Sequence, residues 1–473
     1  MKGRDGMAKI VFLQQHPDEW LGVMYISSML KSRGHQCDVL VEPLERGDII
    51  ERALSQSPDI VAFSCLTSDY FWALNKAEAV KRRSKALTVM GGTHVTLNPE
   101  ESIAQPSIDI ICRGEGEQPM AELADAIDRG RDYRAIRNMW LKSDGGIARN
   151  EVRDLVADLD SLPLPDRELY LKYPHFRKVG KRPLHLGRGC PYDCSYCHNY
   201  RKKELYRGKG PFVRWRAMEH VLEEVRDIRR AGFVKVLHFI DDGFGINRQW
   251  LKTFLQRLAQ TDEVRLAVQA NMRADMVTQD LCAAMKDYGA DLLRLRIAVE
   301  CADEEYRRTV LKKHLSNASL LNAAETFHRY GIDFITYNML GLPGESLNQS
   351  LETLRLNIRL RPSFAHSFIY QPYPGTDLAR YAQDKGYLSS EMLERLGTTE
   401  YQGFFHSRSV LTQPDIKKSE NVQRVFSMVV KHPALFPLAR RAVRFRFLAF
   451  PLRVVRRVSI STFLSRRMRR DKY

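Results

Sequence analysis

Short apolar runs alternate with amphipathic stretches along the first 130 residues. The apolar runs lack polar alternation, which is typical of strands buried on both faces of a parallel sheet. The predicted strands are Lys9–Gln15, Cys37–Glu42, Asp59–Cys65, Ala86–Gly92 and Asp109–Arg113. Helical stretches lie around 18–33, 48–57, 69–84, 99–105 and 117–129. This alternation predicts an α/β, doubly wound, Rossmann-like domain, which binds ligands beyond the carboxyl ends of its strands.

A second series of strand and helix patterns follows a proline-bearing segment, residues 159–169, in which Pro163 and Pro165 favour an extended connector. Its predicted strands are Pro183–Gly189, Val236–Asp242, Arg265–Asn271, Leu292–Glu300, Asp333–Leu342 and His366–Gly375. Its helices are expected at 217–231, 248–260, 278–288, 303–311, 317–330 and 347–360. Six such repeats predict a partial (β/α)6 barrel of the TIM type, with reactive groups at the carboxyl ends of its strands.

These patterns divide the 473 residues into four parts. A ligand-binding domain is expected at 1–150, ending in a hairpin at Asn138–Glu151, and is followed by a linker at 151–182. The barrel is expected at 183–376 and a helical C-terminal region at 377–473. Hydrophobic content of 44% and charged content of 28% are globular values, so a sizeable core is expected.

The net charge of +17 is concentrated at the C-terminus. Residues 421–473 hold 14 of the 74 Lys and Arg residues but one of the 57 acidic residues. A nucleic-acid enzyme more often spreads its positive charge along a substrate channel, so the charge pattern does not favour a nucleic-acid partner.

Arginines interleave with large apolar side chains in this basic stretch. The apolar positions are Leu438, Val443, Phe447, Phe450, Val454 and Val458. No apolar run approaches the roughly 20 residues of a membrane span. Basic amphipathic helices lie on anionic membranes, where each cation contributes about 1 kcal/mol. We therefore predict peripheral attachment to a membrane surface. RNA contact, or a solvated helix packed on the barrel, are the alternatives.

Three cysteines, Cys190, Cys194 and Cys197, lie within eight residues directly after the first barrel strand. Four thiolates normally close an iron–sulfur cluster, so three leave one iron with an open position. A zinc site would pair two Cys-x-x-Cys knuckles, and the sequence has no second one. His198 is poorly placed to complete a tetrahedron beside Cys197. A disulfide framework suits small secreted domains, whereas this chain is long and its first residues have no apolar signal core, so a reducing, cytoplasmic compartment is expected.

The spacing Cys-x3-Cys-x2-Cys, with Tyr196 just before the last cysteine, resembles the cluster loop of the radical S-adenosylmethionine (SAM) superfamily. The resemblance implies a 4Fe–4S cluster held by Cys190, Cys194 and Cys197. It also implies that the amino and carboxylate groups of SAM chelate the fourth iron, and that one electron cleaves SAM to a 5′-deoxyadenosyl radical. The electron would come from an external donor of the flavodoxin or ferredoxin type.

The barrel strand ends carry the residues expected to bind SAM. Asp241 and Asp242 follow the second strand, where the resemblance places the SAM amine; a helix N-cap is the simpler alternative. After the third strand, Gln269, Asn271 and Arg273 are expected to converge, since the Arg fork can bind a carboxylate bidentately. Glu300, a lone carboxylate closing an apolar strand, matches the position that contacts the SAM ribose in the family.

The fifth and sixth barrel strands end in glycine- and proline-bearing segments. Residues Asn338 to Glu345, and Gln371 to Thr376, resemble family turns beside the adenine and the substrate. Tight turns explain these residues equally well.

Polar and glycine residues also follow three strands of the first domain. They are Ser64 and Thr67, then Gly91, Gly92, Thr93 and His94, then Gly114, Glu115 and Gly116. Glycine lets backbone approach a ligand closely, although simple turns would account for it as well. Ahead of a radical SAM loop, the segments GGTHVTLNPEE and DIICRGEGE resemble the cobalamin-binding domain of cobalamin-dependent radical SAM enzymes. That resemblance implies that corrinoid lies on these loops.

One departure from the cobalamin pattern stands at the first strand. Domains that ligate cobalt from below carry Asp-x-His-x-x-Gly there, whereas this chain reads QQHPDEWLG with His16 in another register. Cobalt would then have no histidine ligand from the protein, and a domain that has lost cobalamin stays open as an alternative.

The resemblance spans roughly residues 9–376 and implies an enzyme that functionalises an unactivated carbon. We expect methyl transfer to a hydrophobic substrate such as an isoprenoid lipid or a tetrapyrrole. We expect the enzyme itself to lie on the inner face of the membrane. Relatives of this kind also catalyse cyclisation or rearrangement. A tRNA-modifying radical SAM enzyme and a non-enzymatic electron carrier are the other classes considered. The first would have a second set of cluster cysteines, and the second a fourth cluster ligand.

Overall fold

The computed structural model of the chain describes residues 7–143, 145–260, 265–394 and 408–445. The chain forms two compact units. Of the described residues, the first unit comprises 7–143, 145–191 and 198–237, and the second comprises 192–197, 238–260, 265–394 and 408–445. The cysteine loop thus begins in the first unit and continues in the second.

The first unit contains a seven-stranded sheet in the order β2-β1-β3-β4-β5-β6-β7. Its strands are β1 (Lys9–Gln14), β2 (Gln36–Val41), β3 (Ile60–Ser64), β4 (Leu87–Gly91), β5 (Ile110–Cys112), β6 (Met139–Ser143) and β7 (Gly146–Arg149). The first five run parallel, and the β6–β7 hairpin adds antiparallel strands beside β5. The predicted doubly wound sheet is confirmed, and each predicted strand is within two residues of the observed one at either end.

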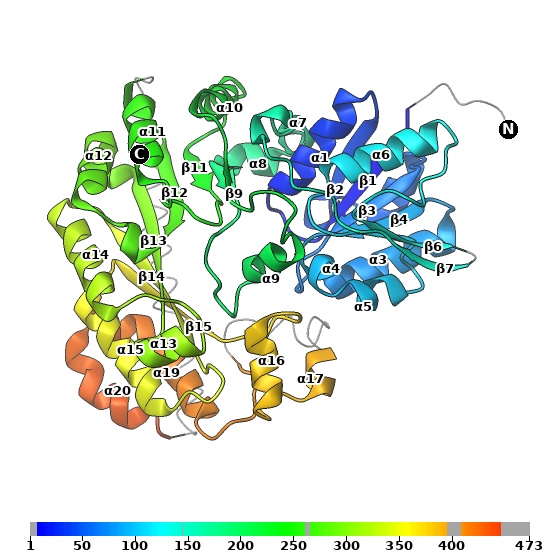
Figure 1. Cartoon of the computed structure of the whole chain (residues 1–473). Helices are drawn as coiled ribbons and strands as arrows, with labels where there is room; N and C mark the ends of the chain where they lie inside the picture. Colours follow the sequence, from blue (N-terminus) through cyan, green and yellow to red (C-terminus); the bar gives the residue numbers. More distant parts are fainter. Residues whose placement is uncertain (1–6, 144, 261–264, 395–407, 446–473) are drawn as a thin grey trace. The chain divides into compact units, whose positions relative to one another are not determined.

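Helices cover both faces of this sheet. They are α1 (Leu21–Ser32), α2 (Ile49–Ser55), α3 (Tyr70–Arg83), α4 (Thr93–Leu97), α5 (Pro99–Ala104) and α6 (Glu117–Asp128). Helices α1 and α6 pack together on one face, whereas α3, α4 and α5 lie on the other (Figure 1). Apolar residues from β1, β3 and β4, including Val11, Val61 and Met90, pack against α3 in one buried cluster. Burial on both faces explains why these strands read as continuous apolar runs.

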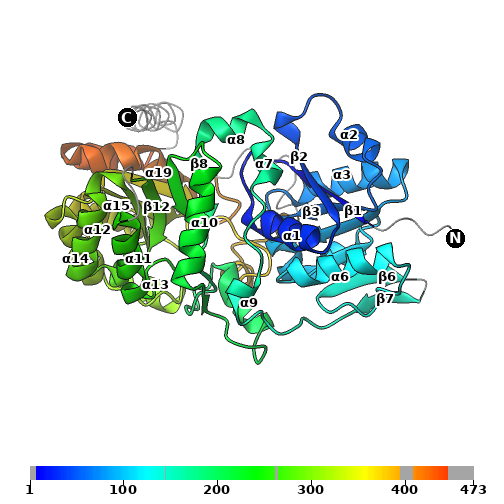
Figure 2. The ribbon, with the colours of Figure 1, turned by 90° about the horizontal axis from the view of Figure 1, so that it is seen from above.

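The second sheet has six strands in the order β15-β14-β13-β12-β11-β8. They are β8 (Lys181–Leu184), β11 (Val236–Phe239), β12 (Ala267–Met272), β13 (Leu293–Glu300), β14 (Phe334–Leu340) and β15 (Phe364–Ile369). The helices between them are α9 (His198–Leu205), α10 (Met218–Arg230), α11 (Arg248–Gln260), α12 (Gln279–Gly289), α13 (Glu304–Thr309), α14 (Asn317–Arg329) and α15 (Leu347–Leu360). Figure 1 shows α11, α12, α14 and α15 one after another along the second unit, and Figure 2 shows the same helices from above. The predicted six-stranded β/α arrangement is therefore confirmed.

Two strand predictions differ from the structure. The predicted strand Pro183–Gly189 is divided into β8 and a two-residue strand, β9 (Gly187–Arg188), which pairs antiparallel with β10 (Arg214–Trp215). A two-residue strand is too short to show any hydrophobic period. The predicted last strand extends to Gly375, whereas β15 ends at Ile369, because Pro372 and Pro374 have no N–H to donate to a sheet.

The segment 151–182, predicted as a linker, contains two short helices, α7 (Glu168–Leu171) and α8 (Pro174–Val179). Tyr170 and Phe176 on these helices are buried. The Tyr170 hydroxyl donates to Gln14 at 2.6 Å. This connector is therefore packed against the first sheet rather than extended through solvent.

The described part of the C-terminal region is helical. It contains α16 (Asp377–Asp384), α17 (Ser390–Glu394), α19 (Ile416–Lys431) and α20 (Phe436–Ala442). Helix α19 packs on β15 and α15, with Val422, Phe426 and Val429 fully buried. The first residues of the basic stretch are therefore part of the core, since a helix with such a face must bury it. Among the described residues, we find no helix that combines the length and apolar content needed to cross a bilayer.

The apolar residues expected to contact a membrane differ in their exposure to solvent. Leu438 on α20 is 67% exposed, whereas Val443 is fully buried against α19. Phe447, Phe450, Val454 and Val458 lie outside the described residues.

Candidate functional site

The cysteine loop lies between β9 and α9. Cys190, Cys194 and Cys197 are all partly exposed and none is in a disulfide. Burial raises the pKa of the Cys194 thiol, and nearby Lys313 opposes that effect. Among the residues the structure describes, no three His, Cys, Asp or Glu side chains are grouped as a metal site. The three-thiolate cluster thus stays a prediction from the loop sequence.

Two residues between the cysteines fasten the loop to the second unit. The Ser195 N–H donates to Leu311 at 3.0 Å, and its hydroxyl donates to Val310 at 2.6 Å. The Tyr196 hydroxyl donates to Glu300 at 2.8 Å. Burial, followed by the Glu300 charge, raises the Tyr196 pKa far above its ordinary value, so the phenol stays protonated. The loop is therefore held by hydrogen bonds through residues that are not cysteines.

Glu300 is the most constrained of the predicted SAM residues. It ends β13 at a register shift against β14, and its φ of 66° lies in the left-handed region that non-glycine residues rarely adopt. A bulge re-aims the side chain that follows it. Backbone strain of this kind costs about 1–3 kcal/mol and clusters at functional sites.

A buried ion pair holds the Glu300 carboxylate. Lys313 Nζ lies 2.8 Å from Glu300 and also donates to the Ala298 carbonyl at 2.8 Å. The two residues are 3% and 6% exposed, respectively. Sequence reasoning missed Lys313, since it is one of two adjacent lysines and no periodicity distinguishes the buried one. Its location identifies Glu300, Lys313 and Tyr196 as one hydrogen-bonded group.

The predicted SAM residues on β11 and β12 are placed differently from one another. Asp241, just after β11, is buried, whereas Asp242 is exposed. On β12, Gln269 is buried and Asn271 is exposed. Gln269 lies within β12, whereas Asn271 is near its carboxyl end and the two aspartates follow β11, and all four stay predicted cofactor contacts.

Arg273 contacts the cysteine loop. Its guanidinium lies 3.6 Å from the ring centre of Tyr192, within cation–π distance. Asp275 accepts two hydrogen bonds from the same guanidinium, at 3.0 and 2.8 Å. The fork that we expected to bind a SAM carboxylate is therefore occupied by a neighbouring carboxylate in this structure.

Asn338 is part of β14, and its side chain contacts Asn357 of α15. Its amide nitrogen donates to the His366 carbonyl at 2.8 Å, and its amide oxygen accepts from Asn357 at 2.6 Å. Thr336 donates to the same Asn357 at 2.6 Å. The side chain is thus engaged on the helix-covered face of the sheet, and contact with SAM through it stays a prediction.

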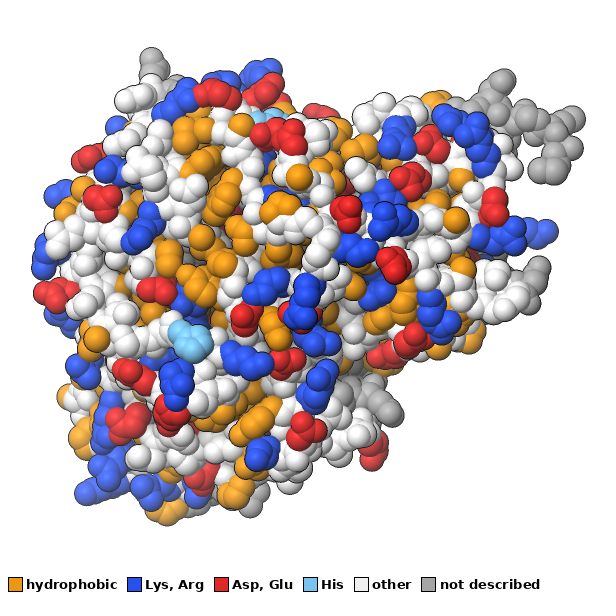
Figure 3. Space-filling view, in the orientation of Figure 1, with side chains coloured by type: hydrophobic (Ala, Val, Ile, Leu, Met, Phe, Trp, Pro, Cys, Tyr) orange, Lys and Arg blue, Asp and Glu red, His pale blue; other side chains and the backbone are white. Residues whose placement is uncertain are grey.

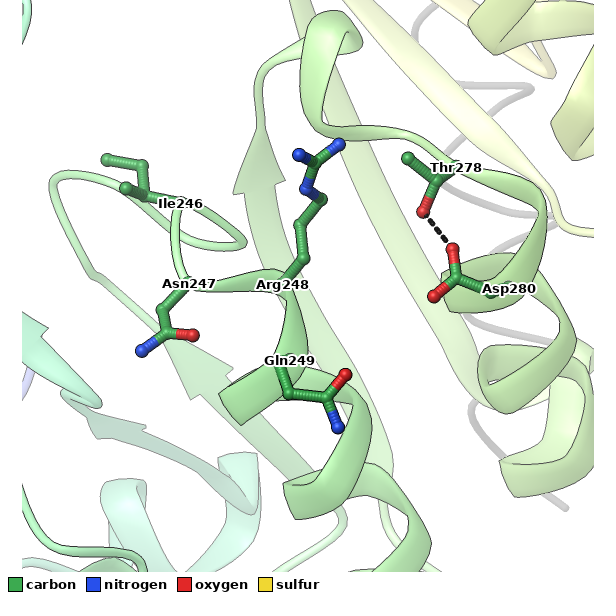
Figure 4. A pocket seen from close by; sticks show the side chains of 6 residues that line it. All are labelled: Ile246, Asn247, Arg248, Gln249, Thr278 and Asp280. Atoms are coloured by element: carbon green, nitrogen blue, oxygen red, sulfur yellow. Dashed lines mark hydrogen bonds between the residues drawn. The ribbon is translucent and has the colours of Figure 1, made fainter.

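A surface hollow lies at the start of α11 and α12. It is lined by Ile246, Asn247, Arg248, Gln249, Thr278 and Asp280, with the Thr278 hydroxyl donating to Asp280 at 2.6 Å (Figure 4). None of the predicted cofactor residues lines it. We assign no ligand to this hollow.

In the first unit, the predicted cobalamin residues follow the adjacent strands β3, β4 and β5. Backbone hydrogen bonds join the first two loops, from Cys65 N–H to Gly91 at 2.9 Å and from His94 N–H to Cys65 at 3.1 Å. The Gly114 N–H donates to Thr96 at 3.0 Å, which joins the third loop to α4. Ser64, Thr67 and Thr93 add hydroxyls at the same sheet edge. The three loops thus lie together beyond β3, β4 and β5, and their contact with cobalamin stays a prediction.

Gly92 allows this close packing. Its φ is 95°, and a Cβ atom there would lie 2.6 Å from both the N and O atoms of Cys65. We expect Gly92→Ala to lower the free energy of unfolding by at least about 2 kcal/mol, since strain and a backbone clash combine. Chemical denaturation of the full chain would measure it. Gly130→Ala is the matched control, because Gly130 has φ of 60° but open space. Equal losses in both variants would show that the contact with Cys65 is unimportant.

His94 is buried beside these loops. Its Nδ1 lies 3.2 Å from the Thr67 hydroxyl, and its ring centre lies 4.0 Å from that of Tyr70, with the two planes tilted by 33°. Burial lowers the His94 pKa to about 4, so the imidazole is neutral at pH 7. Its Nε2 is buried and has no hydrogen-bond partner among the described residues. A buried ring nitrogen without a hydrogen-bond partner, next to the glycine loops, is consistent with a site that binds a polar ligand.

The third loop departs from expectation. The Glu115 carboxylate, predicted to contact cobalamin, binds Arg214 bidentately at 2.6 and 3.1 Å and lies 3.3 Å from Arg188. Burial raises the Glu115 pKa, but the two arginines outweigh it, so the pKa lies below its ordinary value. Gly116 is the N-cap of α6, and a Cβ atom there would lie 3.1 Å from Ile26 Cδ1. The side chain of Glu115 therefore serves ion pairs within the protein in this structure.

The residues present fit the cofactors that the sequence implies. The donor set of the cysteine loop is three thiols, the usual ligands of iron–sulfur clusters. The three glycine loops and the buried His94 form a polar edge beyond a parallel sheet, the usual place for a ligand of a doubly wound domain.

Two protein families match the chain. The B12 binding domain matches residues 14–124, and the Radical SAM superfamily matches residues 184–356.

Three curated relatives are similar in sequence. An uncharacterized methyltransferase of Pyrococcus horikoshii is 29% identical over 371 residues, covering 76% of this chain and 78% of the relative. The anaerobic magnesium-protoporphyrin IX monomethyl ester cyclase of Rubrivivax gelatinosus is 25% identical over 442 residues, covering 85% and 76%. The hopanoid C-3 methylase of Methylococcus capsulatus is 23% identical over 378 residues, covering 78% and 68%.

Two solved structures share the fold. The radical SAM methyltransferase TsrM of Kitasatospora setae, with cobalamin and a 4Fe–4S cluster, gives a TM-score of 0.66 at 16% identity, covering 79% of this chain and 74% of that one. The cobalamin-dependent SAM radical enzyme OxsB, with aqua-cobalamin and SAM, gives 0.70 at 16% identity, covering 96% and 72%.

Proposed function

Because the chain belongs to the radical SAM enzymes that carry a B12-binding domain, we propose that it transfers a methyl group to an unactivated carbon of a hydrophobic substrate. The cofactors of these domains are a 4Fe–4S cluster with SAM, and cobalamin. The observation on which the proposal rests is that a B12 binding domain precedes a Radical SAM domain in one chain. An uncharacterized methyltransferase is similar to 76% of this chain.

When bound, these cofactors supply a carbon-centred radical and a methyl donor, which protein side chains alone do not provide. We propose that Cys190, Cys194 and Cys197 hold the cluster. Tyr196, Glu300 and Lys313 fix the loop between the last two cysteines, and the left-handed backbone at Glu300 directs its carboxylate. Asp241, Asp242, Gln269 and Asn271 would contact SAM from the two neighbouring strand ends. The polar loops after β3, β4 and β5 would hold the corrinoid.

The test is anaerobic reconstitution with iron, sulfide and hydroxocobalamin, followed by assay with SAM bearing a trideuterated methyl group. Two probe substrates, a tetrapyrrole ester and a hopanoid, represent the chemistry of two relatives. We expect corrinoid absorption, 5′-deoxyadenosine, and a product that gains the labelled methyl. Absence of corrinoid absorption in the reconstituted chain would refute methyl transfer while leaving SAM cleavage intact.

A second candidate is ring closure without methyl transfer. It is favoured by the similarity to a cyclase over 85% of this chain. Methyl transfer adds a carbon and leaves S-adenosylhomocysteine, whereas cyclisation leaves the carbon count unchanged. With the labelled SAM above, an unlabelled product without S-adenosylhomocysteine would identify the cyclase reaction.

We also propose that the C-terminal region attaches the enzyme to the inner, cytoplasmic face of a membrane, where a hydrophobic substrate would be found. Leu438 and Phe445 are 67% and 51% exposed, and Arg440, Arg441 and Arg444 are exposed beside them. At the lower left of Figure 3, where Figure 1 has α15, α19 and α20, Lys and Arg side chains lie beside hydrophobic ones. Residues 446–473 add nine further Lys and Arg residues.

We expect the full chain to float with anionic vesicles and not with zwitterionic ones. A chain that ends at Phe445 should float much less, since each cation near the surface contributes about 1 kcal/mol. Truncation at residue 421 would be a poor test, because it removes the buried face of α19. Arg82→Gln, at an exposed arginine on α3, is the control variant. Equal flotation of the full and shortened chains would end this proposal.

A further inference from the structure

Two segments beside the cysteine loop hold the same part of the first unit. Arg188 stands two residues before Cys190, and Tyr206 stands nine residues after Cys197. Both contact residues 114–117, the loop that follows β5 and begins α6. All of these contacts lie within the first unit.

The first contact is an ion-pair network. Arg188 donates to Glu117 at 2.6 Å and lies 3.3 Å from Glu115, and its guanidinium is 5.0 Å from the ring centre of Tyr25. Arg214 on β10, the partner strand of β9, completes the network through its bidentate bond to Glu115. The four charged side chains are between 4% and 20% exposed, so solvent screens these pairs weakly.

The second contact is a tyrosine that fills the space above a glycine. Gly114 has φ of 77°, and a Cβ atom there would lie 1.8 Å from the Tyr206 hydroxyl. That hydroxyl accepts a hydrogen bond from the Glu115 N–H at 2.9 Å and one from Asn138 at 3.4 Å. The side chain is 4% exposed. Any side chain at position 114 would clash with Tyr206, so this position needs a glycine. The conformation of residues 114–117 therefore depends on a residue that follows the cysteine loop.

We propose that Arg188 and Tyr206 are positioning residues that couple residues 114–117, where corrinoid is predicted to bind, to the cysteine loop. This inference rests on the proposed function. A ligand that orders residues 114–117 would shift Arg188 and Tyr206, and through them the two ends of the cysteine loop. Buried, well-packed contacts transmit such displacements because they have no room to absorb them. Linkage then requires that the corrinoid and SAM change each other's affinity by the same factor.

The experiment uses the full chain with its cluster reconstituted. The dissociation constant of SAM is measured by titration calorimetry with and without hydroxocobalamin, and corrinoid absorption of the same sample verifies loading. We expect the two constants to differ by at least about fivefold in the unmodified chain. In Arg188→Gln and Tyr206→Phe the ratio should fall toward one. The electron paramagnetic resonance spectrum of the reduced cluster, altered by corrinoid in the unmodified chain, should become insensitive to it.

Two controls separate coupling from general destabilisation. Arg149→Gln breaks an exposed pair with Glu100 in the same unit, and Tyr288→Phe removes a buried hydroxyl that donates to Leu266 at 2.6 Å. Both should keep the ratio of the unmodified chain. A ratio of one in the unmodified chain, or an undiminished ratio in both test variants, would overturn the coupling. An unmodified chain that takes up no corrinoid would instead refute the proposed function and this inference with it.

Discussion

Serine in place of Cys190, Cys194 or Cys197 is expected to abolish SAM cleavage. Each thiol is predicted to bind one iron, and the spacing leaves no spare cysteine within the loop. The substituted chain should hold little iron after reconstitution and produce 5′-deoxyadenosine at the level of protein without a cluster. Iron analysis and chromatography of the nucleoside product would measure the two effects.

Cys282→Ala is the matched control for this result. Cys282 is fully buried on α12, and burial raises the pKa of its thiol to about 12. Because Cys282 lies outside the cysteine loop, its replacement should leave the iron content unchanged. Full activity in any of the three serine variants would contradict the assignment of that cysteine.

Methionine in place of Lys313 is expected to destabilise the chain strongly. The substitution leaves the Glu300 carboxylate buried, with the Tyr196 hydroxyl as its remaining hydrogen-bond donor among the described residues. Removing one member of a buried ion pair costs about 3–5 kcal/mol. We expect a loss of that size in chemical denaturation, together with weaker SAM binding, because Glu300 and Tyr196 hold the cysteine loop.

The adjacent lysine provides the comparison. Lys312 is 45% exposed and pairs with Asp377 at 2.9 Å. An exposed pair of this kind contributes about 0–1 kcal/mol. Lys312→Met should therefore have a small effect on stability and on SAM affinity. Equal losses in the two variants would show that the buried pair has no special importance.

The strands could be predicted from sequence because their side-chain patterns are local. Residues 60–64 form a short apolar run between turn signals, and residues 293–296 alternate leucine with arginine, which indicates a period of two. The short strands β9 and β10 could not be predicted, since two residues show no period. The end of β15 differs from the predicted one because Pro372 and Pro374, which the predicted strand includes, lie beyond Ile369.

The site was predicted as a set of residue types but not as a set of contacts. The cysteine spacing and the glycine loops are local features, so the sequence shows them directly. The pairing of Glu300 with Lys313, and of Glu115 with Arg188 and Arg214, depends on residues distant in the chain. Charges on separate elements give no sequence signal for their partner, which is why Glu115 was expected to bind a ligand. Arg273 differs, because its partner Asp275 is only two residues away in the sequence.

The central claim is that one iron of the cluster has no protein ligand and binds SAM. Mössbauer spectroscopy of the chain reconstituted with iron-57 and sulfide tests it, with spectra recorded before and after SAM is added. We predict that SAM changes the parameters of one iron in four while the other three keep those of thiolate-bound sites. Spectra that are identical with and without SAM, or zinc in place of iron, would contradict it.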